Sequence, residues 1–231
     1  MAEPAAPRWP WRARLGAATG AGAVLLLMLS AWWFVEYSAA LGWSGLTRDL
    51  WPESRFDRPD TRVSAAIFAH MIAGAAITAL APLQLLPAIR RRAPVVHRWL
   101  GRVIVAAALV TGVAGLLWIA AEGTVGGAWM SLWFALYGLA MIVAATQAIR
   151  FARAGAMTRH RDWALRLFVL AMGSWAYRIH YGLWWALTDG AATNDAFTGA
   201  FDRVNVVAFF VPYLAALELG LARARRRQAT G

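Results

Sequence analysis

Histidine is the residue in this sequence best suited to chemistry, and the chain has only four. His70 lies near the start of one apolar run and His180 near the end of another, each roughly 10 Å along a helix from the same side of a membrane. Two neutral imidazoles at matched depth on different helices are typical axial ligands of haem b. We therefore predict a haem b or related metal centre at His70 and His180, with Arg178 as the partner of a haem propionate. The alternative is that each histidine bonds to a neighbouring helix.

The other two histidines, His97 and His160, begin two apolar runs on the opposite side. A second haem at this pair would carry electrons across the membrane, to a quinone or another redox partner. However, His160 and His180 are separated by 20 residues of one predicted helix, which turns their side chains to nearly opposite faces. A simpler interpretation is that His97 and His160 meet water and lipid phosphate at the membrane surface.

Arginines surround this second pair and suggest a different function. Arg90, Arg98, Arg102 and Arg166 supply cationic donors suited to phosphate or carboxylate. With His97 and His160 they predict a non-redox site for an anion or a lipid headgroup. A third possibility is an assembly subunit that binds no ligand. The sequence holds no hydrolase, phosphate-loop or zinc-protease motif, so no catalytic residue is assigned.

The composition explains why these residues must be positioned by membrane helices. Hydrophobic residues make up 60% of the chain and charged residues 15%, against about 25% charged in an average soluble domain. The net charge of +11 comes from 23 basic residues, all arginine, which gather between apolar runs. That distribution is typical of membrane topology and argues against nucleic-acid binding. The lack of cysteine excludes disulfides and thiolate ligands.

Six apolar runs are long enough to cross a bilayer whose hydrocarbon core is about 30 Å thick. They are Leu15–Val35, Ser64–Ala88, Leu100–Ala121, Ala128–Ile149, Trp163–Leu187 and Val204–Leu221. The fold class is therefore all-α: a polytopic membrane protein with six transmembrane helices, of which the second to fifth form a four-helix core and two are peripheral. Residues 15–222 form this domain, between a tail at 1–14 and a basic tail at 223–231. Pro82 and Pro212 should kink the second and sixth helices.

The arginines also predict orientation. Three precede the first span, five flank each of two alternate loops, and four follow the last span, whereas most acidic residues lie in the other loops. The positive-inside rule then places both termini in the cytoplasm of a bacterial cell, with the chain in its inner membrane. Arg178 falls within the fifth span and needs an acidic or carbonyl partner. Glu36 is the best-placed acid, with Asp189 and Asp202 as alternatives.

Several of these residues also form recognisable motifs. They are Pro82-Leu83-Gln84, the loop at Arg90, His97-Arg98-x-x-Gly101-Arg102 and His160-x-x-Trp163-x-x-Arg166. Over roughly Ser64 to Arg178 the chain resembles an uncharacterised bacterial membrane family, domain of unknown function 2306. The resemblance implies a multi-helix membrane protein and brings no established activity.

Overall fold

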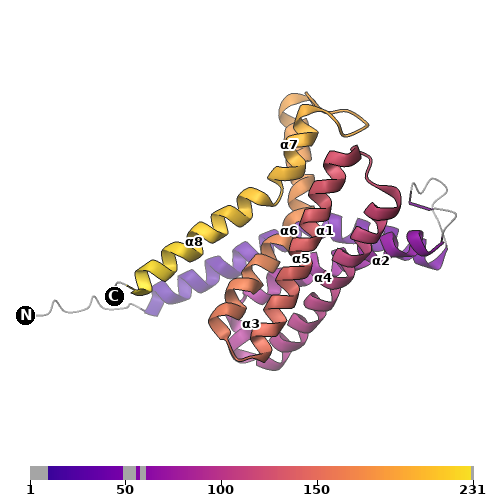
Figure 1. The fold of residues 1–231 in the computed structure, drawn as a ribbon. Coiled ribbons are helices and arrows are strands. Elements are labelled where there is room, and N and C mark those ends of the chain that lie inside the picture. Colours follow the sequence, from indigo (N-terminus) through magenta and orange to yellow (C-terminus); the bar gives the residue numbers. More distant parts are fainter. Residues whose placement is uncertain (1–9, 49–55, 58–60, 230–231) are drawn as a thin grey trace, which may run out of the picture.

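The computed structural model describes residues 10–48, 56–57 and 61–229, so most of the predicted N-terminal tail lies outside it. The described residues are 88% helical and contain no strand, which confirms the all-α class. The helices are α1 (Pro10–Thr47), α2 (Thr61–Leu80), the 3₁₀ helix η1 (Ala81–Leu85), α3 (Pro87–Arg92), α4 (Pro94–Glu122), α5 (Gly127–Arg153), α6 (Met157–Thr188), α7 (Ala200–Ala208) and α8 (Val211–Ala229) (Figure 1).

Five segments of the described chain are long and apolar enough to span a membrane. They are Thr19–Thr47, Arg62–Leu85, Pro94–Glu122, Gly127–Arg153 and Ala200–Ala229. The chain is thus a multi-pass membrane protein whose exposed apolar side chains face lipid. At 32 residues α6 is also long enough, but polar residues such as Arg178 and His180 interrupt its apolar sequence. The sixth predicted span therefore stays a prediction.

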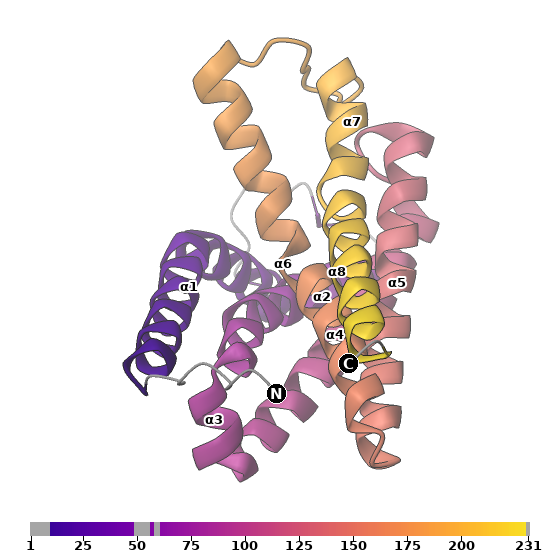
Figure 2. The ribbon, with the colours of Figure 1, turned by 90° about the vertical axis from the view of Figure 1, so that its left-hand side faces the viewer.

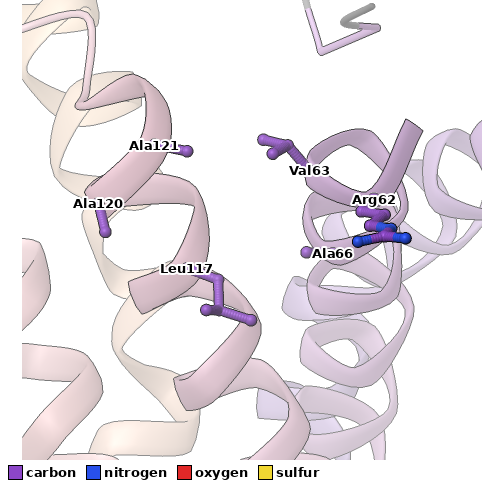
Figure 3. Close-up of a pocket in the computed structure, with 6 residues that line it drawn as sticks. All are labelled: Arg62, Val63, Ala66, Leu117, Ala120 and Ala121. Carbon is purple, nitrogen blue, oxygen red and sulfur yellow. The ribbon is translucent and has the colours of Figure 1, made fainter. Parts of the chain in front are cut away.

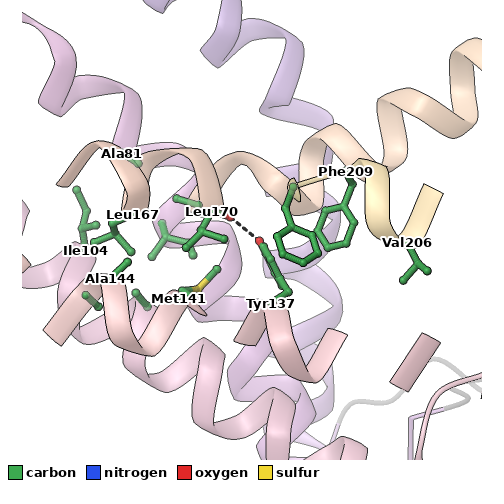
Figure 4. Packing of buried hydrophobic residues seen from close by; sticks show 14 of the residues in the cluster. Ala81, Ile104, Tyr137, Met141, Ala144, Leu167, Leu170, Val206 and Phe209 are labelled. Carbon is green, nitrogen blue, oxygen red and sulfur yellow. Dashed lines mark hydrogen bonds between the residues drawn. The ribbon is translucent and has the colours of Figure 1, made fainter. Parts of the chain in front are cut away.

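The core lies between α2, α4, α5 and α6, which are the four helices predicted to form it. Side chains of α2, η1, α4, α5 and α6 interdigitate there, and Phe209 and Phe210, which follow α7, add aromatic rings at one end (Figure 4). Tyr137 of α5 is central: its ring packs on Phe209, and its hydroxyl donates a hydrogen bond to the carbonyl of Leu170 in α6. The first helix packs mainly on α2, from outside this core.

Proline shapes both predicted kinks. The α-helical part of the second span ends at Leu80, and Pro82 lies in η1, because proline removes a backbone donor and clashes with the preceding turn. The last span is broken into α7 and α8 at Phe209–Phe210, so that Pro212 occupies the first turn of α8, where proline is tolerated.

Beyond the break, α8 leans away from α4 and α5 (Figures 1 and 2). Two ion pairs join it to α6. Arg166 of α6 pairs with Glu218 of α8 at 2.6 Å, and Asp162 of α6 pairs with Arg225 of α8 at 3.3 Å. The pairing of Glu218 with Arg166 of α6 supplies polar contacts where α8 has little apolar packing. The end of α8 and the start of α1 lie toward the same end of the molecule as α3 (Figure 2).

Candidate functional site

The end of the bundle that holds α3 is built from three proline-started turns. Pro82 lies in η1, Pro87 begins α3 and Pro94 begins α4. Between η1 and α3, Leu86 adopts an extended conformation, so the chain reverses within a few residues. As a result η1, which carries the polar residue Gln84, contacts α1, α2, α4 and α6.

Gln84 contacts the first turn of α4. Its Nε2 atom donates a hydrogen bond to the backbone carbonyl of His97, at 3.0 Å. Because a carbonyl only accepts, this bond fixes the orientation of the amide and leaves Oε1 as the free atom. Oε1 is buried and has no hydrogen-bond partner among the described residues, and the same holds for Nδ1 of His97. Two buried polar atoms without partners in one small region are unusual in a folded protein.

His160, at the start of α6, completes this region. Its Nδ1 donates a hydrogen bond to the carbonyl of Ala148 in α5 at 2.9 Å, which fixes the ring and leaves Nε2 without a hydrogen bond to any residue that the structure describes. His160, Arg90 and Arg98 lie close enough to His97 for their positive charges to act on it. We call Gln84, Arg90, His97, Arg98 and His160 the inner polar site.

Two residues predicted for this site are engaged elsewhere. Arg166 makes a bidentate ion pair with Glu218 of α8, with N–O distances of 2.6 and 2.8 Å. The guanidinium of Arg102 stacks over the ring of Trp99, 4.8 Å from its centre. Of the four predicted arginines, Arg90 and Arg98 thus keep exposed side chains without such a contact.

His70, in α2, points toward α4. Its Nδ1 donates a hydrogen bond to the carbonyl of Thr111 at 2.7 Å. A Cβ atom at Gly115 would lie 2.9 Å from that nitrogen, so the absence of a side chain there allows the ring to approach α4. The bond fixes the tautomer and leaves Nε2 as an acceptor. Metal-binding histidines are commonly held in this way.

His180 faces a different part of the molecule. Its Nδ1 donates to Oδ1 of Asn205 in α7 at 2.7 Å, since the amide nitrogen of Asn205 is directed to the carbonyl of Tyr177. Its Nε2 therefore accepts from the hydroxyl of Tyr213 in α8, at 2.8 Å. Both ring nitrogens are occupied, and His180 holds α6 against α7 and α8.

The structure thus directs the two predicted axial ligands to different helices, His70 to α4 and His180 to α7 and α8. Arg178 contacts neither ring by a hydrogen bond. It donates to the carbonyl of Ser174 at 3.0 Å, and its guanidinium lies 4.5 Å from the ring centre of Phe34 in α1. Of the two kinds of partner predicted for Arg178, the carbonyl is the one observed.

One pocket lies apart from all of these residues. It has a volume of about 380 Å³ and lies between the start of α2 and the end of α4, which are remote from α3. Its walls are apolar apart from one arginine and consist of Arg62, Val63, Ala66, Leu117, Ala120 and Ala121 (Figure 3). None of the predicted site residues lines it.

Comparison with known proteins identifies the family of this chain. The model of a family described as "Predicted membrane protein (DUF2306)" matches residues 67–219. The chain belongs to this family. The match confirms the resemblance predicted from the motifs around Gln84, His97 and His160, and it extends past Arg178 into α8. No curated protein and no solved structure matches the chain. Membership of DUF2306 therefore supports an integral membrane protein and leaves the function to the site.

Sequence reasoning missed the partners of His180. Asn205 is 1% exposed although it lies in a predicted apolar span, and that position was the available signal, because a buried amide in a membrane needs a partner. Tyr213 gave no comparable signal, since tyrosine is common near membrane surfaces.

Proposed function

We propose that this member of DUF2306 binds an anionic group, a phosphate or carboxylate of a lipid headgroup or small metabolite, at the inner polar site. The observation that carries the proposal is the pair of buried, unpartnered atoms, Oε1 of Gln84 and Nδ1 of His97. Leaving such atoms unpaired costs about 1–3 kcal/mol each, so a bound group that pairs with both is favoured. Two exposed arginines of the same site, Arg90 and Arg98, add positive charge beside these atoms.

The donors and acceptors narrow the chemistry of this ligand. Oε1 of Gln84 only accepts, so it needs an O–H or N–H from the ligand. Nδ1 of His97 can donate an N–H even from the neutral ring, and Arg90 and Arg98 add positive charge. A singly protonated phosphate monoester offers one O–H and several acceptor oxygens, and so matches both requirements. The ion pair of Arg166 with Glu218 then serves to hold α8 rather than to bind the ligand.

The distribution of the arginines predicts how the chain is oriented in the membrane. The positive-inside rule puts the arginine-rich end of the bundle, with α3 and the inner polar site, in the cytoplasm of a bacterial cell. The site then lies at the level of the inner-leaflet headgroups, where anionic lipids concentrate. Lipid is accordingly the first partner that we propose.

The test measures thermal stability of the protein in mild detergent. Inorganic phosphate and a short-chain phosphatidic acid should raise the melting temperature, whereas a phosphatidylcholine of equal chain length should not. In Gln84→Met and in Arg98→Gln, the ligand concentration needed for the same rise in melting temperature should be at least tenfold higher. Arg91→Gln is the matched control, because Arg91 is an exposed arginine of α3 that is not part of the inner polar site. Equal responses from Arg98→Gln and Arg91→Gln would contradict the proposal.

Haem b is the second candidate, and one observation favours it. The Nδ1 bond of His70 to the carbonyl of Thr111 orients the ring and leaves Nε2 available, as in many haem ligands. His180 fits less well, because a bond from its Nε2 to iron would displace the hydroxyl of Tyr213. Haem would supply one-electron transfer, to a quinone or another redox partner.

An absorption spectrum separates the two candidates. Protein from haem-replete cells should show sharp reduced bands near one haem per chain if haem binds, and His70→Ala should abolish them. A flat spectrum from monodisperse protein would exclude haem and leave the anion site. A protein that neither absorbs nor responds to phosphate, but copurifies with another subunit, would favour the assembly alternative.

A further inference from the structure

A second polar region lies deeper in the membrane, between α2 and α6. These helices are joined by a hydrogen bond from Oγ1 of Thr78 to the carbonyl of Ala171, at 3.3 Å. The chain reverses between α2 and α4, between α4 and α5 and between α5 and α6, so α2 and α6 run in opposite directions. His70 precedes Thr78 by about two turns, and Arg178 follows Ala171 by about two turns. At 1.5 Å per residue each therefore lies about 10–12 Å along its own helix from the bond, toward the same end of the bundle.

Each of these two side chains has an unused polar group. The hydrogen bond from Nδ1 of His70 to Thr111 leaves Nε2 as an acceptor without a partner among the described residues. Arg178 uses one of its five N–H groups on the carbonyl of Ser174. No carboxylate pairs with Arg178 in the part of the chain that the structure describes, although a membrane-embedded arginine is unfavourable unless it is paired.

The groups around Arg178 suit a ligand that has a polar head and an apolar tail. The guanidinium carbon lies 4.5 Å from the ring centre of Phe34, and the indole nitrogen of Trp175 donates to the carbonyl of Ser30 one turn earlier in α1. The side chain of Arg178 remains exposed at this contact between α1 and α6, so it is accessible from the apolar phase. Its charge acts on His70, which places both side chains in one electrostatic environment.

We propose that Arg178 and His70 form a membrane-embedded site for the carboxylic head of a lipid-soluble acid, such as a long-chain fatty acid. The carboxylate accepts from the fork of Arg178, a planar arrangement that matches two carboxyl oxygens. When the acid is protonated, its O–H donates to Nε2 of His70 instead. The apolar tail lies in the membrane beside α1. The site is separate from the inner polar site and does not depend on it.

The experiment titrates dodecanoate and dodecanol into the protein in lipid nanodiscs by calorimetry, with empty nanodiscs subtracted. The acid should bind at least tenfold more tightly than the alcohol of equal chain length. Arg178→Gln should abolish this difference. Arg203→Gln, at an exposed position of α7, and Arg98→Gln, at the inner polar site, should keep it.

Equal binding of acid and alcohol to the wild-type protein would overturn the proposal without recourse to any variant. Loss of the difference in Arg98→Gln but not in Arg178→Gln would also overturn it, because the carboxylate would then bind at the inner polar site. Retention of phosphate binding in Arg178→Gln checks that the variant is folded, and it separates failure of this site from failure of the proposed function.

Discussion

The hydrogen bond between His180 and Asn205 provides a sharp test of how α6 is held to α7. Replacing His180 by phenylalanine keeps the ring but removes two hydrogen bonds, to Asn205 and Tyr213. Replacing Asn205 by leucine removes the bonds to His180 and to the carbonyl of Tyr177. Hydrogen bonds between membrane helices contribute about 0.6 kcal/mol on average and up to about 1.7. Each variant should therefore lower the free energy of unfolding by about 1–3 kcal/mol.

The two substitutions share one bond, so their effects should not add. In the double variant the combined loss should be smaller than the sum by about 0.6–1.7 kcal/mol, the contribution of the shared bond. The assay is unfolding of the purified protein by increasing SDS in mixed micelles, followed by circular dichroism. The control combines His180→Phe with Gln84→Met, which lies in η1 at the other end of the bundle, and should be additive. Additivity of His180→Phe with Asn205→Leu would refute the assigned role of His180.

Three further predictions follow from the packing and the charges. Gly45→Ala should lower stability by about 1–3 kcal/mol in the same assay, because its Cβ would lie 2.2 Å from the ring of an α2 phenylalanine; an unchanged midpoint would contradict the tight α1–α2 contact. Glu218→Gln should cost at most about 1 kcal/mol, because the carboxylate that pairs with Arg166 is 47% exposed, and high salt should reduce the difference from wild type. In the naturally cysteine-free chain, Arg91→Cys should react with an impermeant thiol reagent only in opened cells, and Asp195→Cys in intact spheroplasts; the reverse pattern would invert the proposed orientation.

Much of the helical organisation was predictable because a bilayer imposes it on the sequence. Spans of apolar residues near Ile104 or Met141 satisfy their backbone hydrogen bonds within one helix, whatever their neighbours. Pro82 breaks its helix through a local clash that needs no tertiary contact. The motifs at His97 and His160 likewise indicated the family before any contact was known.

The site was harder to predict, and α6 shows why. Its sequence places His160, Arg166, Arg178 and His180 along one helix, but not the direction in which each points. In a soluble protein the apolar face of a helix would indicate that direction. In a membrane the outer face is apolar too, so the pattern of hydrophobic residues leaves the rotation of the helix open.

An all-α membrane protein, the position of most spans and the family follow from the sequence alone, because hydrophobic length and proline act locally. The folded structure was needed to show that Arg166 pairs with Glu218, that His180 bonds to Asn205 and Tyr213, and that Gln84 bonds to the carbonyl of His97. These contacts join residues 13 to 52 positions apart in the chain. They depend on how the helices rotate and pack, which a linear pattern of residues does not specify.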